Sequence, residues 1–294
     1  MKLIKILHVG MSPNPGGLES YVLNMYSGID KEKIRFDFLS NFDEPLAVES
    51  KIDSANTTIH RIVSRKKNPI KSNYQLKKIF KENHYDYVHL HIMTYNWLTP
   101  AILAYKRGSK VILHSHIAQR FDVMSKKEKI LNYIGKWNLK RFKYLKLACS
   151  EKAGISLFKT DYQIMENGID YNKFKYSADA RSVIRNKYQI RDNEIVIGHV
   201  GNFHYIKNYP FILNVFSQIL EINANCRLML IGDYHHNTSV LEQIKQLKIE
   251  DKVILTGKIN NSHIYYSAMD TYFLPSHFEG LNISLIEAQA NGLK

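Results

Sequence analysis

Residues 194–231 read EIVIGHVGNFHYIKNYPFILNVFSQILEINANCRLMLI and contain the repeating unit of the fold. A short apolar run at Glu194–Val200 is followed by a glycine loop, a helical pattern at Pro210–Ile222 and a second apolar run at Cys226–Ile231. Nearly continuous apolar strands that alternate with helices are typical of a parallel sheet with helices on both faces. This stretch therefore predicts an α/β fold.

The same alternation extends over almost the whole chain. Further helices are expected at Tyr74–Lys81, Lys126–Phe142 and Val240–Leu247. The other expected strands are Leu3–Val9, Ile34–Leu39, Thr58–Val63, Asp86–His91, Lys110–Ser115, Tyr144–Cys149, Tyr162–Met165, Lys252–Thr256 and Asp270–Leu274. Ligands of such sheets bind at the carboxyl ends of the strands, so the loops after the strands are where chemistry is expected.

A polar, charged stretch at 171–191 separates two groups of strands, directly after the turn signal Asn167-Gly168. The length of 294 residues also exceeds what one core comfortably holds. We therefore predict two Rossmann-like doubly wound parallel-sheet domains, residues 1–168 and 169–294. The second domain is expected to be incomplete, because four strands follow Gly168 and seven precede it.

The chain is basic, with 41 Lys and Arg against 27 Asp and Glu and a formal charge of +14. Such a charge fits nucleic acid, an anionic membrane surface or an anionic small ligand. Nucleic acid is not expected, because no helix-turn-helix, zinc-finger or aromatic RNA-binding signature is present. The two cysteines, Cys149 and Cys226, favour a reducing compartment. No apolar run approaches the ~20 residues of a membrane span, so a cytoplasmic protein is predicted.

Two glycines, Gly16 and Gly17, follow the first strand. They would allow a ligand to approach the backbone closely, and the free N–H groups of the next helix would suit an anion. A plain tight turn explains the pair equally well. The dinucleotide pattern G-x-G-x-x-G is absent, which argues against a nicotinamide enzyme.

Two strands end in histidine pairs, His89-x-His91 and His114-x-His116. Because both strands belong to one sheet, the four side chains are expected at the same edge. No cysteine or carboxylate joins them at ligand spacing, so hydrogen-bonding or ligand-contacting histidines are favoured over a zinc site. A purely structural role stays open.

A third loop, residues 201–208, combines Gly201 and Asn202 with Lys207 just ahead of a helix. Backbone donors and one mobile cation would suit a diphosphate. A surface lysine in an ordinary loop is an equally good interpretation.

The segment after the last expected strand contains two carboxylates. Residues 275–288 read PSHFEGLNISLIEA, with Glu279 in the loop and Glu287 expected on the first turn of the next helix. Two carboxylates facing one crevice can hold neighbouring hydroxyls of a ribose or hexose through charge-assisted hydrogen bonds. The alternative for Glu287 is a capping box, Ser284-x-x-Glu287, which needs no ligand.

These motifs, taken in order, resemble a retaining glycosyltransferase of family 4, with the GT-B fold of two domains facing a cleft, of the bacterial polysaccharide-assembly type. The likeness is carried by residues 16–19, 86–91, 114–116, 148–150, 167–170, 232–233 and 275–292, of which the last, with Glu279-x7-Glu287, is the most specific. Capsule or exopolysaccharide biosynthesis is the implied setting.

The resemblance implies a role for each motif. The C-terminal domain would bind the nucleotide sugar, which is expected to be a UDP-sugar, and the N-terminal domain a glycan or lipid-linked acceptor. Glu287 would hold the ribose, Lys207 would neutralise the diphosphate, and His116 would lie beside the transferring sugar. The implied donor-binding residues are Gly16, Gly17, Gly201, Asn202, Lys207, Glu279, Gly280, Leu281 and Glu287, and the implied catalytic residues are His116, Glu279 and Lys207.

No D-x-D occurs in the chain, so neither a metal nor another cofactor is expected, and the site itself must stabilise the leaving diphosphate. Front-face return and double displacement stay open. Two departures from the family matter. Asn202 stands where members commonly carry Arg, and the chain ends at Lys294 where complete members continue. We therefore keep a second hypothesis, a catalytically inactive truncated remnant that at most binds nucleotide.

A basic, aromatic stretch at Lys126–Lys146 has two interpretations. It could lie on the anionic inner face of the plasma membrane and bring the enzyme to a lipid-linked acceptor. A second basic cluster, 61–81, supports this. The favoured interpretation is an ordinary helix with its apolar side on the sheet and its lysines in water.

Overall fold

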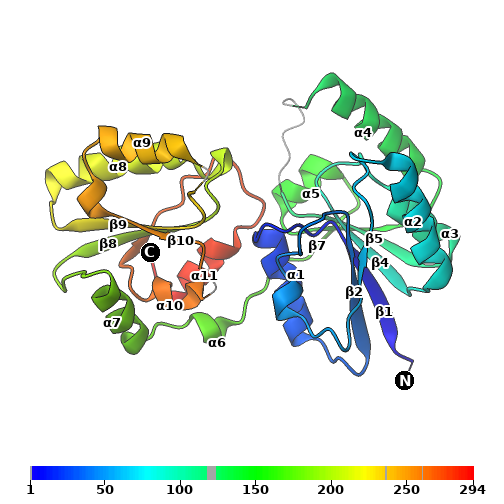
Figure 1. The fold of residues 1–294 in the computed structure, drawn as a ribbon, viewed down its shortest axis with the longest axis horizontal. Helices are drawn as coiled ribbons and strands as arrows, with labels where there is room; N and C mark the ends of the chain where they lie inside the picture. The colour runs from blue at the N-terminus through cyan, green and yellow to red at the C-terminus, as the bar shows by residue number, and fades with distance from the viewer. Residues whose placement is uncertain (1, 118–123, 236, 260) are drawn as a thin grey trace. The chain divides into compact units, whose positions relative to one another are not determined.

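The computed structural model describes residues 2–117, 124–235, 237–259 and 261–294 (Figure 1). The chain divides into two compact units, Met1–Gly168 and Ile169–Lys294. Each unit is built around its own parallel sheet with helices on both faces, as the strand–helix alternation predicts. Among the described residues, no helix combines the length and the apolar character that crossing a bilayer requires.

The N-terminal unit contains a seven-stranded sheet in the order β3-β2-β1-β4-β5-β6-β7. Its strands are β1 (Ile4–Val9), β2 (Ile34–Ser40), β3 (Ile59–Arg61), β4 (Tyr87–Ile92), β5 (Lys110–Ser115), β6 (Leu145–Ala148) and β7 (Gln163–Ile164). Its α-helices are α1 (Gly17–Gly28), α2 (Pro69–Glu82), α3 (Thr99–Lys106), α4 (Lys126–Leu139) and α5 (Glu151–Leu157). All pairings are parallel, and the order reverses between β1 and β4, which makes the sheet doubly wound.

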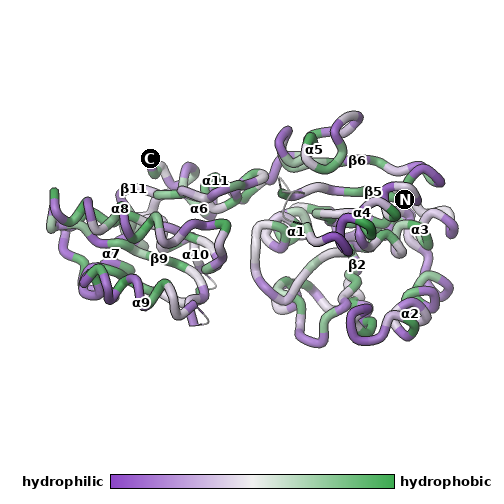
Figure 2. Tube along the Cα trace, turned by 90° about the horizontal axis from the view of Figure 1, so that it is seen from above, coloured by the Kyte–Doolittle hydropathy of each residue, from purple (hydrophilic) through white to green (hydrophobic). Residues whose placement is uncertain are grey.

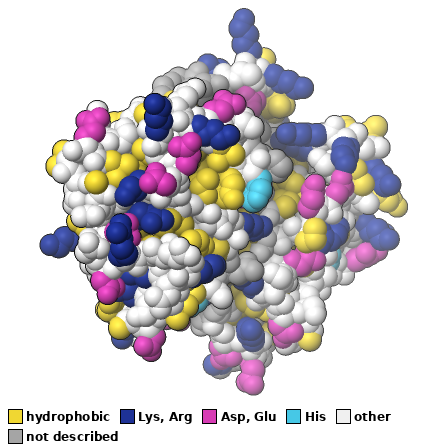
Figure 3. Space-filling view, turned by 60° about the vertical axis from the view of Figure 1, so that its left-hand side comes forward, with side chains coloured by type: hydrophobic (Ala, Val, Ile, Leu, Met, Phe, Trp, Pro, Cys, Tyr) yellow, Lys and Arg dark blue, Asp and Glu magenta, His cyan; other side chains and the backbone are white. Residues whose placement is uncertain are grey.

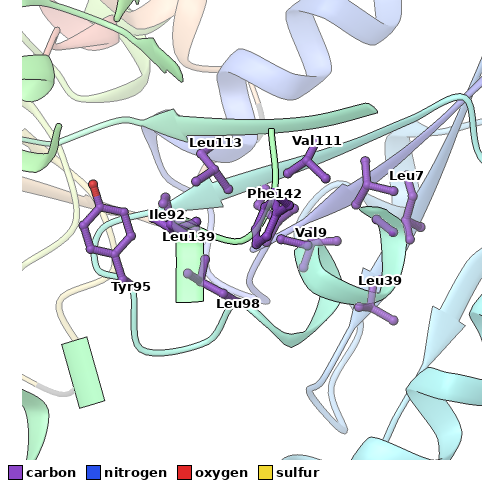
Figure 4. Close-up of a cluster of buried hydrophobic side chains, with 14 of the residues drawn as sticks. Leu7, Val9, Leu39, Ile92, Tyr95, Leu98, Val111, Leu113, Leu139 and Phe142 are labelled. Carbon is purple, nitrogen blue, oxygen red and sulfur yellow. The ribbon is translucent and has the colours of Figure 1, made fainter. Parts of the chain in front are cut away.

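The two faces of this sheet differ in chemistry. Side chains of alternate residues, such as Leu7, Val9 and Leu113, join an apolar core with residues of α2, α3 and α4 (Figure 4). The residues between them on β1, β4 and β5 are largely histidines. Since successive side chains of a strand point to opposite faces, the histidines gather on the other face.

The C-terminal unit contains a four-stranded sheet in the order β10-β9-β8-β11. Its strands are β8 (Ile195–Val200), β9 (Cys226–Ile231), β10 (Val253–Gly257) and β11 (Thr271–Tyr272). Its α-helices are α6 (Tyr171–Phe174), α7 (Ala178–Lys187), α8 (Tyr209–Ile222), α9 (Thr238–Gln246), α10 (Ser262–Tyr266) and α11 (Ile283–Asn291). The green apolar stretches of the strands in Figure 2 fit burial on both faces, where separate cores form around Ile212 and Tyr266.

The polar stretch 171–191 contains α6 and α7, although the sequence indicated only a break. The side chain of Ser177 caps α7 by accepting from the backbone N–H of Ala180. Arg185 is buried and bonds Asp270 Oδ2 at 2.6 Å, together with three backbone carbonyls. A polar helix packs here because a distant carboxylate and carbonyl groups satisfy its arginine.

Two expected helix ends differ from the structure by three residues or more, and the other differences are of one or two residues. Helix α2 begins at Pro69 instead of Tyr74, because the side chain of Asn68 caps it by accepting from the Lys71 N–H. Helix α4 ends at Leu139 instead of Phe142. Pro in the first turn and an Asn cap are the usual start of a helix, so the earlier beginning of α2 follows from local sequence.

Candidate functional site

Lys207 and Glu279 form an ion pair in the C-terminal unit, with Nζ 2.7 Å from Oε1. Lys207 ends a short 3₁₀ turn after β8, and Glu279 lies in the loop between β11 and α11. A Cβ on Gly201 would lie 3.0 Å from Lys207 Cε, so the glycine gives the lysine stem room to cross the loop. The structure thus brings together two charged groups that the sequence predicts in separate loops.

The two loops are fastened to each other. The backbone N–H of His277 donates to Ile206 O at 2.9 Å, and the rings of Tyr205 and His277 stack with centroids 4.6 Å apart. Gly280 and Leu281, both half-buried, lead from Glu279 into α11. In the other loop, the carbonyl of Asn202 accepts from the His204 N–H at 2.7 Å. The Lys207–Glu279 pair therefore rests on a scaffold that backbone contacts define.

Glu287 lies on the second turn of α11, as its fifth residue, and not on the first turn as the sequence suggested. Its Oε2 accepts a hydrogen bond from the Tyr266 hydroxyl at 2.7 Å. Burial raises the pKa of Glu287 to about 7, against the opposing effects of the Tyr266 hydroxyl and the charge of Lys173. A half-buried carboxylate with this pKa would gain from further hydrogen-bond donors.

The capping-box interpretation of Ser284 and Glu287 is wrong. The cap of α11 is Asn282, whose side chain accepts from the Leu285 N–H at 3.0 Å. Ser284 Oγ instead lies 3.1 Å from the carbonyl oxygen of Val200 and accepts from the Tyr272 hydroxyl at 2.8 Å. Helix α11 is thereby fixed to the end of β8.

The hydroxyl of Tyr272 is influenced by the charges of both carboxylates, Glu279 and Glu287. Burial raises the pKa of its hydroxyl, hydrogen bonds with Ser284 and the Val200 backbone lower it, and the charges of Glu287 and Glu279 add smaller upward shifts. Both carboxylates therefore act on one buried phenol although they come from a helix and a loop. Tyr266 and Tyr272 were missed at the sequence level, since an aromatic residue in a buried strand or helix carries no separate signal of a polar role.

In the N-terminal unit, Gly16 caps α1 and Gly17 begins it. A Cβ on Gly16 would lie 3.1 Å from Glu19 Oε2, whereas one on Gly17 would meet nothing within 4 Å. The buried Glu19 accepts from both the backbone N–H and the hydroxyl of Ser12 at 2.9 Å. Glu19 therefore shapes this loop, although the sequence gives no separate indication of this role, and Gly17 leaves open space beside it.

Five histidines form a cluster on one face of the N-terminal sheet, which we call the histidine cluster: His8, His89, His91, His114 and His116. Three contacts join the rings: His8 Nδ1 to His91 Nε2 at 3.0 Å, His91 Nδ1 to His116 Nε2 at 2.8 Å, and His89 Nε2 to His114 Nδ1 at 3.1 Å. The ring of Tyr21 from α1 packs against His114 and His116. His8 was missed, although it lies beside His89 in the register of β1 and β4.

Burial keeps the histidine cluster neutral. It lowers the pKa of His8 to about 3 and of His114 to about 4, and it holds the pKa values of the other members well below 6.5. Two sets of three, His8/His89/His91 and His91/His114/His116, have ligand nitrogens within 4.8 Å of one another. Two nitrogens on a tetrahedral zinc are separated by about 3.3 Å. The contacts of 2.8 to 3.1 Å are shorter and fit hydrogen bonds better.

Helix α4 exposes its apolar side chains, so the favoured interpretation of Lys126–Lys146 is wrong. Tyr133 is 74% exposed, Ile130 61%, Trp137 51% and Ile134 48%. The helix packs instead through Gly135 and Leu139, and a Cβ on Gly135 would lie 1.9 Å from the Tyr95 carbonyl oxygen. The exposed side chains recur at helical spacing and so form one stripe.

Basic side chains flank this stripe, and the Arg141 guanidinium lies 4.0 Å from the centroid of the Trp137 ring. The exposed basic residues of the segment are Lys126, Lys127, Lys129, Lys136, Lys140, Arg141 and Lys143. Figure 3 shows a face of the molecule on which acidic and basic side chains are interspersed.

Comparisons with known proteins agree with both halves of the fold. The family model "Glycosyl transferases group 1" matches residues 180–294, and "Glycosyl transferase 4-like" matches residues 14–149. Between them the two models cover the C-terminal sheet and five of the seven strands of the N-terminal sheet, all but β1 and β7. The chain is a group 1 glycosyltransferase.

Relatives of this glycosyltransferase share most of its length. EpsF of Bacillus subtilis (strain 168), assigned as a glycosyltransferase, is 28% identical over 98% of this chain and 77% of its own length. The UDP-Gal:alpha-D-GlcNAc-diphosphoundecaprenol alpha-1,3-galactosyltransferase of Escherichia coli is 24% identical over 99% and 78%. The structure of HepE from Anabaena in complex with UDP and glucose superposes with a TM-score of 0.81 at 19% identity, covering 99% of this chain and 79% of that one. The last likeness establishes the GT-B fold.

Proposed function

We propose that this glycosyltransferase moves a sugar from a UDP-sugar to a glycan or lipid-linked acceptor in the assembly of a cell-surface polysaccharide, with retention of configuration, in the cytoplasm. The observation that carries the proposal is the Lys207–Glu279 pair in the same unit as the half-buried carboxylate of Glu287. HepE was solved with UDP and glucose, and the E. coli relative is named for a UDP-Gal donor and a diphosphoundecaprenol-linked substrate, which supports the choice of donor and acceptor.

The donor would bind to the C-terminal unit by completing hydrogen bonds that the site begins. The two ribose hydroxyls would donate to Glu287, which already accepts from Tyr266. Glu279 would accept from hydroxyls of the sugar, and Lys207 would turn toward the diphosphate. The loop residues Gly201, Asn202, Gly280 and Leu281 would line the phosphates, and the N–H groups of the first turn of α11 would donate to them.

Transfer requires the site to stabilise the charge that develops on the leaving diphosphate. Lys207, once it turns from Glu279, and the N–H groups at the start of α11 would supply this stabilisation, so that in this scheme the chain's own positive groups suffice without a metal. In the N-terminal unit, His116 would contact the sugar, and Gly16 and Gly17 would leave space for the donor phosphates. Front-face return and double displacement both remain compatible with retention.

Nucleotide binding tests the donor site directly. We expect calorimetry to show binding of UDP, weaker binding of GDP and ADP, and loss of UDP binding in Glu287→Ala. Glu242→Ala, which removes an exposed carboxylate of α9, is the matched control and should bind as the parent does. Undiminished binding by Glu287→Ala would remove its assigned role, and a preference for GDP or ADP would refute the UDP donor. UDP release from a UDP-sugar separates an active enzyme from a remnant that only binds nucleotide.

We further propose that α4 docks on an anionic membrane and brings the enzyme to a lipid-linked acceptor. The stripe of Ile130, Tyr133, Ile134 and Trp137 would enter the headgroup boundary, and the flanking lysines would contact lipid phosphates. Each basic residue near such a surface contributes about 1 kcal/mol. Each buried large apolar side chain adds about 1.5–3 kcal/mol.

Vesicle co-sedimentation tests this docking. The protein should bind vesicles that contain phosphatidylglycerol far better than vesicles of phosphatidylcholine alone, and salt should weaken binding. Trp137→Glu should lower the affinity at least about tenfold, since it removes one anchor and adds repulsion. Ile222→Glu is the control, because Ile222 is 88% exposed on α8 and lies outside the stripe. Equal losses in both variants would refute docking through α4.

A further inference from the structure

Three members of the histidine cluster form a row of hydrogen bonds: His8, His91 and His116. His91 is in the middle and uses both ring nitrogens, at 3.0 Å from His8 Nδ1 and 2.8 Å from His116 Nε2. His8 and His91 are buried and His116 is half-buried, directly after the carboxyl end of β5. The row therefore connects the interior of the N-terminal unit with the edge of the sheet where ligands of such folds bind.

Counting protons limits the row to two arrangements. A neutral imidazole carries one N–H, so His91 must donate from one nitrogen and accept at the other. If His8 Nδ1 donates to His91 Nε2, then His91 Nδ1 donates to His116 Nε2, and the proton of His116 is on Nδ1. If His116 Nε2 donates to His91 Nδ1, then His91 Nε2 donates to His8 Nδ1, and the proton of His8 is on Nε2.

The surroundings of His8 favour the first arrangement. His8 Nε2 is buried and makes no hydrogen bond in the described part of the chain. Buried N–H groups without an acceptor are the rarer and costlier kind of unsatisfied polar group. The first arrangement avoids a buried, unpaired N–H group, because His8 Nε2 then carries only a lone pair.

We propose that His8 and His91 are positioning residues that hold His116 as the neutral tautomer with its proton on Nδ1, so that His116 presents a fixed hydrogen-bond donor to an oxygen of the substrate. The contact with substrate rests on the proposed glycosyl transfer, whereas the tautomer does not. A neutral donor suits this reaction, because positive charge develops on the transferring sugar and an imidazolium beside it would be repelled.

The remaining pair of the cluster provides a built-in control. His89 and His114 bond each other at 3.1 Å and make no recorded hydrogen bond to the row within the described residues. Both are as buried as His8. A change at His89 therefore perturbs packing in the same place without breaking the row.

Nitrogen NMR of selectively ¹⁵N-histidine-labelled protein without ligand tests the tautomer. His116, assigned by comparison with His116→Ala, should show a protonated Nδ1 and an unprotonated Nε2. His8→Phe should abolish this pattern and give a mixture of tautomers, whereas His89→Phe should preserve it. His8→Asn should restore it, because the Asn amide can donate from near the position of Nδ1. A protonated Nε2 in the parent, or an unchanged pattern in His8→Phe, would overturn the proposal.

Hydrolysis of UDP-glucose measures the consequence for the reaction. His8→Phe should lower kcat/KM about tenfold relative to His89→Phe, the effect of one misplaced hydrogen bond. His8→Asn should recover most of the loss. Equal losses in His8→Phe and His89→Phe would show packing alone and overturn the positioning role. If the parent hydrolyses no UDP-sugar, the proposed function fails, and the tautomer pattern alone decides whether the row exists.

Cobalt titration tests the rival interpretation as a metal site. We expect added Co²⁺ to give no d–d absorption bands, because the ring nitrogens of the row are engaged in hydrogen bonds with one another. Tetrahedral Co²⁺ bands that disappear in His91→Phe would show that the cluster binds metal, and would overturn the proposal.

Discussion

Replacing Glu287 by Gln removes a carboxyl group whose pKa burial raises to about 7. In the unfolded chain the same group titrates near its ordinary value of 4.5. A raised acid pKa means that the folded state holds the proton more tightly, so ionisation costs folding free energy. At about 1.36 kcal/mol per tenfold change in proton affinity, the ionised form costs about 3 kcal/mol.

The sign and the pH window follow from these values. Below about pH 4.5 the group is protonated in both states and costs nothing, whereas above about pH 7 it is ionised in both and the full cost applies. Gln keeps an oxygen to which the Tyr266 hydroxyl can donate. Glu287→Gln should therefore be about 2–3 kcal/mol more stable than the parent at about pH 8 and equal to it at about pH 4.5.

Urea unfolding followed by two probes assigns the effect to the correct unit. Trp97 and Trp137 are the two tryptophans, and both lie in the N-terminal unit, so their fluorescence reports that unit alone. Far-UV circular dichroism reports both units. The gain in unfolding free energy should appear in the dichroism transition and not in the fluorescence transition. UDP affinity should fall at least about tenfold, since a charge-assisted hydrogen bond becomes a neutral one. A variant that gains no stability at high pH, or that binds UDP as the parent does, would refute the reasoning.

Three further predictions concern other parts of the molecule. The N-terminal unit should lose several kcal/mol as the pH falls from about 6.5 to about 4, because His8 and His114 stay neutral when folded but protonate when unfolded; urea midpoints from tryptophan fluorescence check this. Gly135→Ala should undock α4 and cost about 2 kcal/mol or more, since its Cβ would meet the Tyr95 carbonyl; protease cleavage within α4 should rise. Asp270→Asn should cost the C-terminal unit about 3 kcal/mol by dichroism, because a buried arginine loses its charged partner.

The sequence predicts the strands well because both faces of each sheet are covered. A buried parallel strand is a continuous apolar run, and such runs at Ile195–Val200 and Cys226–Ile231 are visible without any partner. Helix α7 is different, since its packing depends on Arg185 meeting a carboxylate 85 residues away. No local pattern indicates that a polar helix will find such a partner.

In the candidate site, too, contacts between residues far apart in the sequence could not be predicted. Lys207 and Glu279 each follow a strand and were predicted separately, but their contact spans 72 residues. Ser284 has the spacing of a capping residue, yet Asn282 occupies that place and Ser284 bonds the end of β8. Local spacing therefore identifies the residues that are able to cap a helix or bind a ligand. Which of them does so depends on the tertiary fold.

Each unit keeps titratable side chains in positions where burial destabilises their charged form, and one explanation can account for both. Glu287 in one unit and the histidine cluster in the other are both removed from water, and burial shifts both pKa values toward the neutral form. Apolar residues at these positions would avoid the desolvation cost, as they do on the opposite face of the N-terminal sheet. The cost falls on helix α11, on strands β1, β4 and β5 and also on His199 of β8, whose pKa burial lowers to about 4. A group that lowers stability where an apolar one would raise it is best explained by what it does for a ligand.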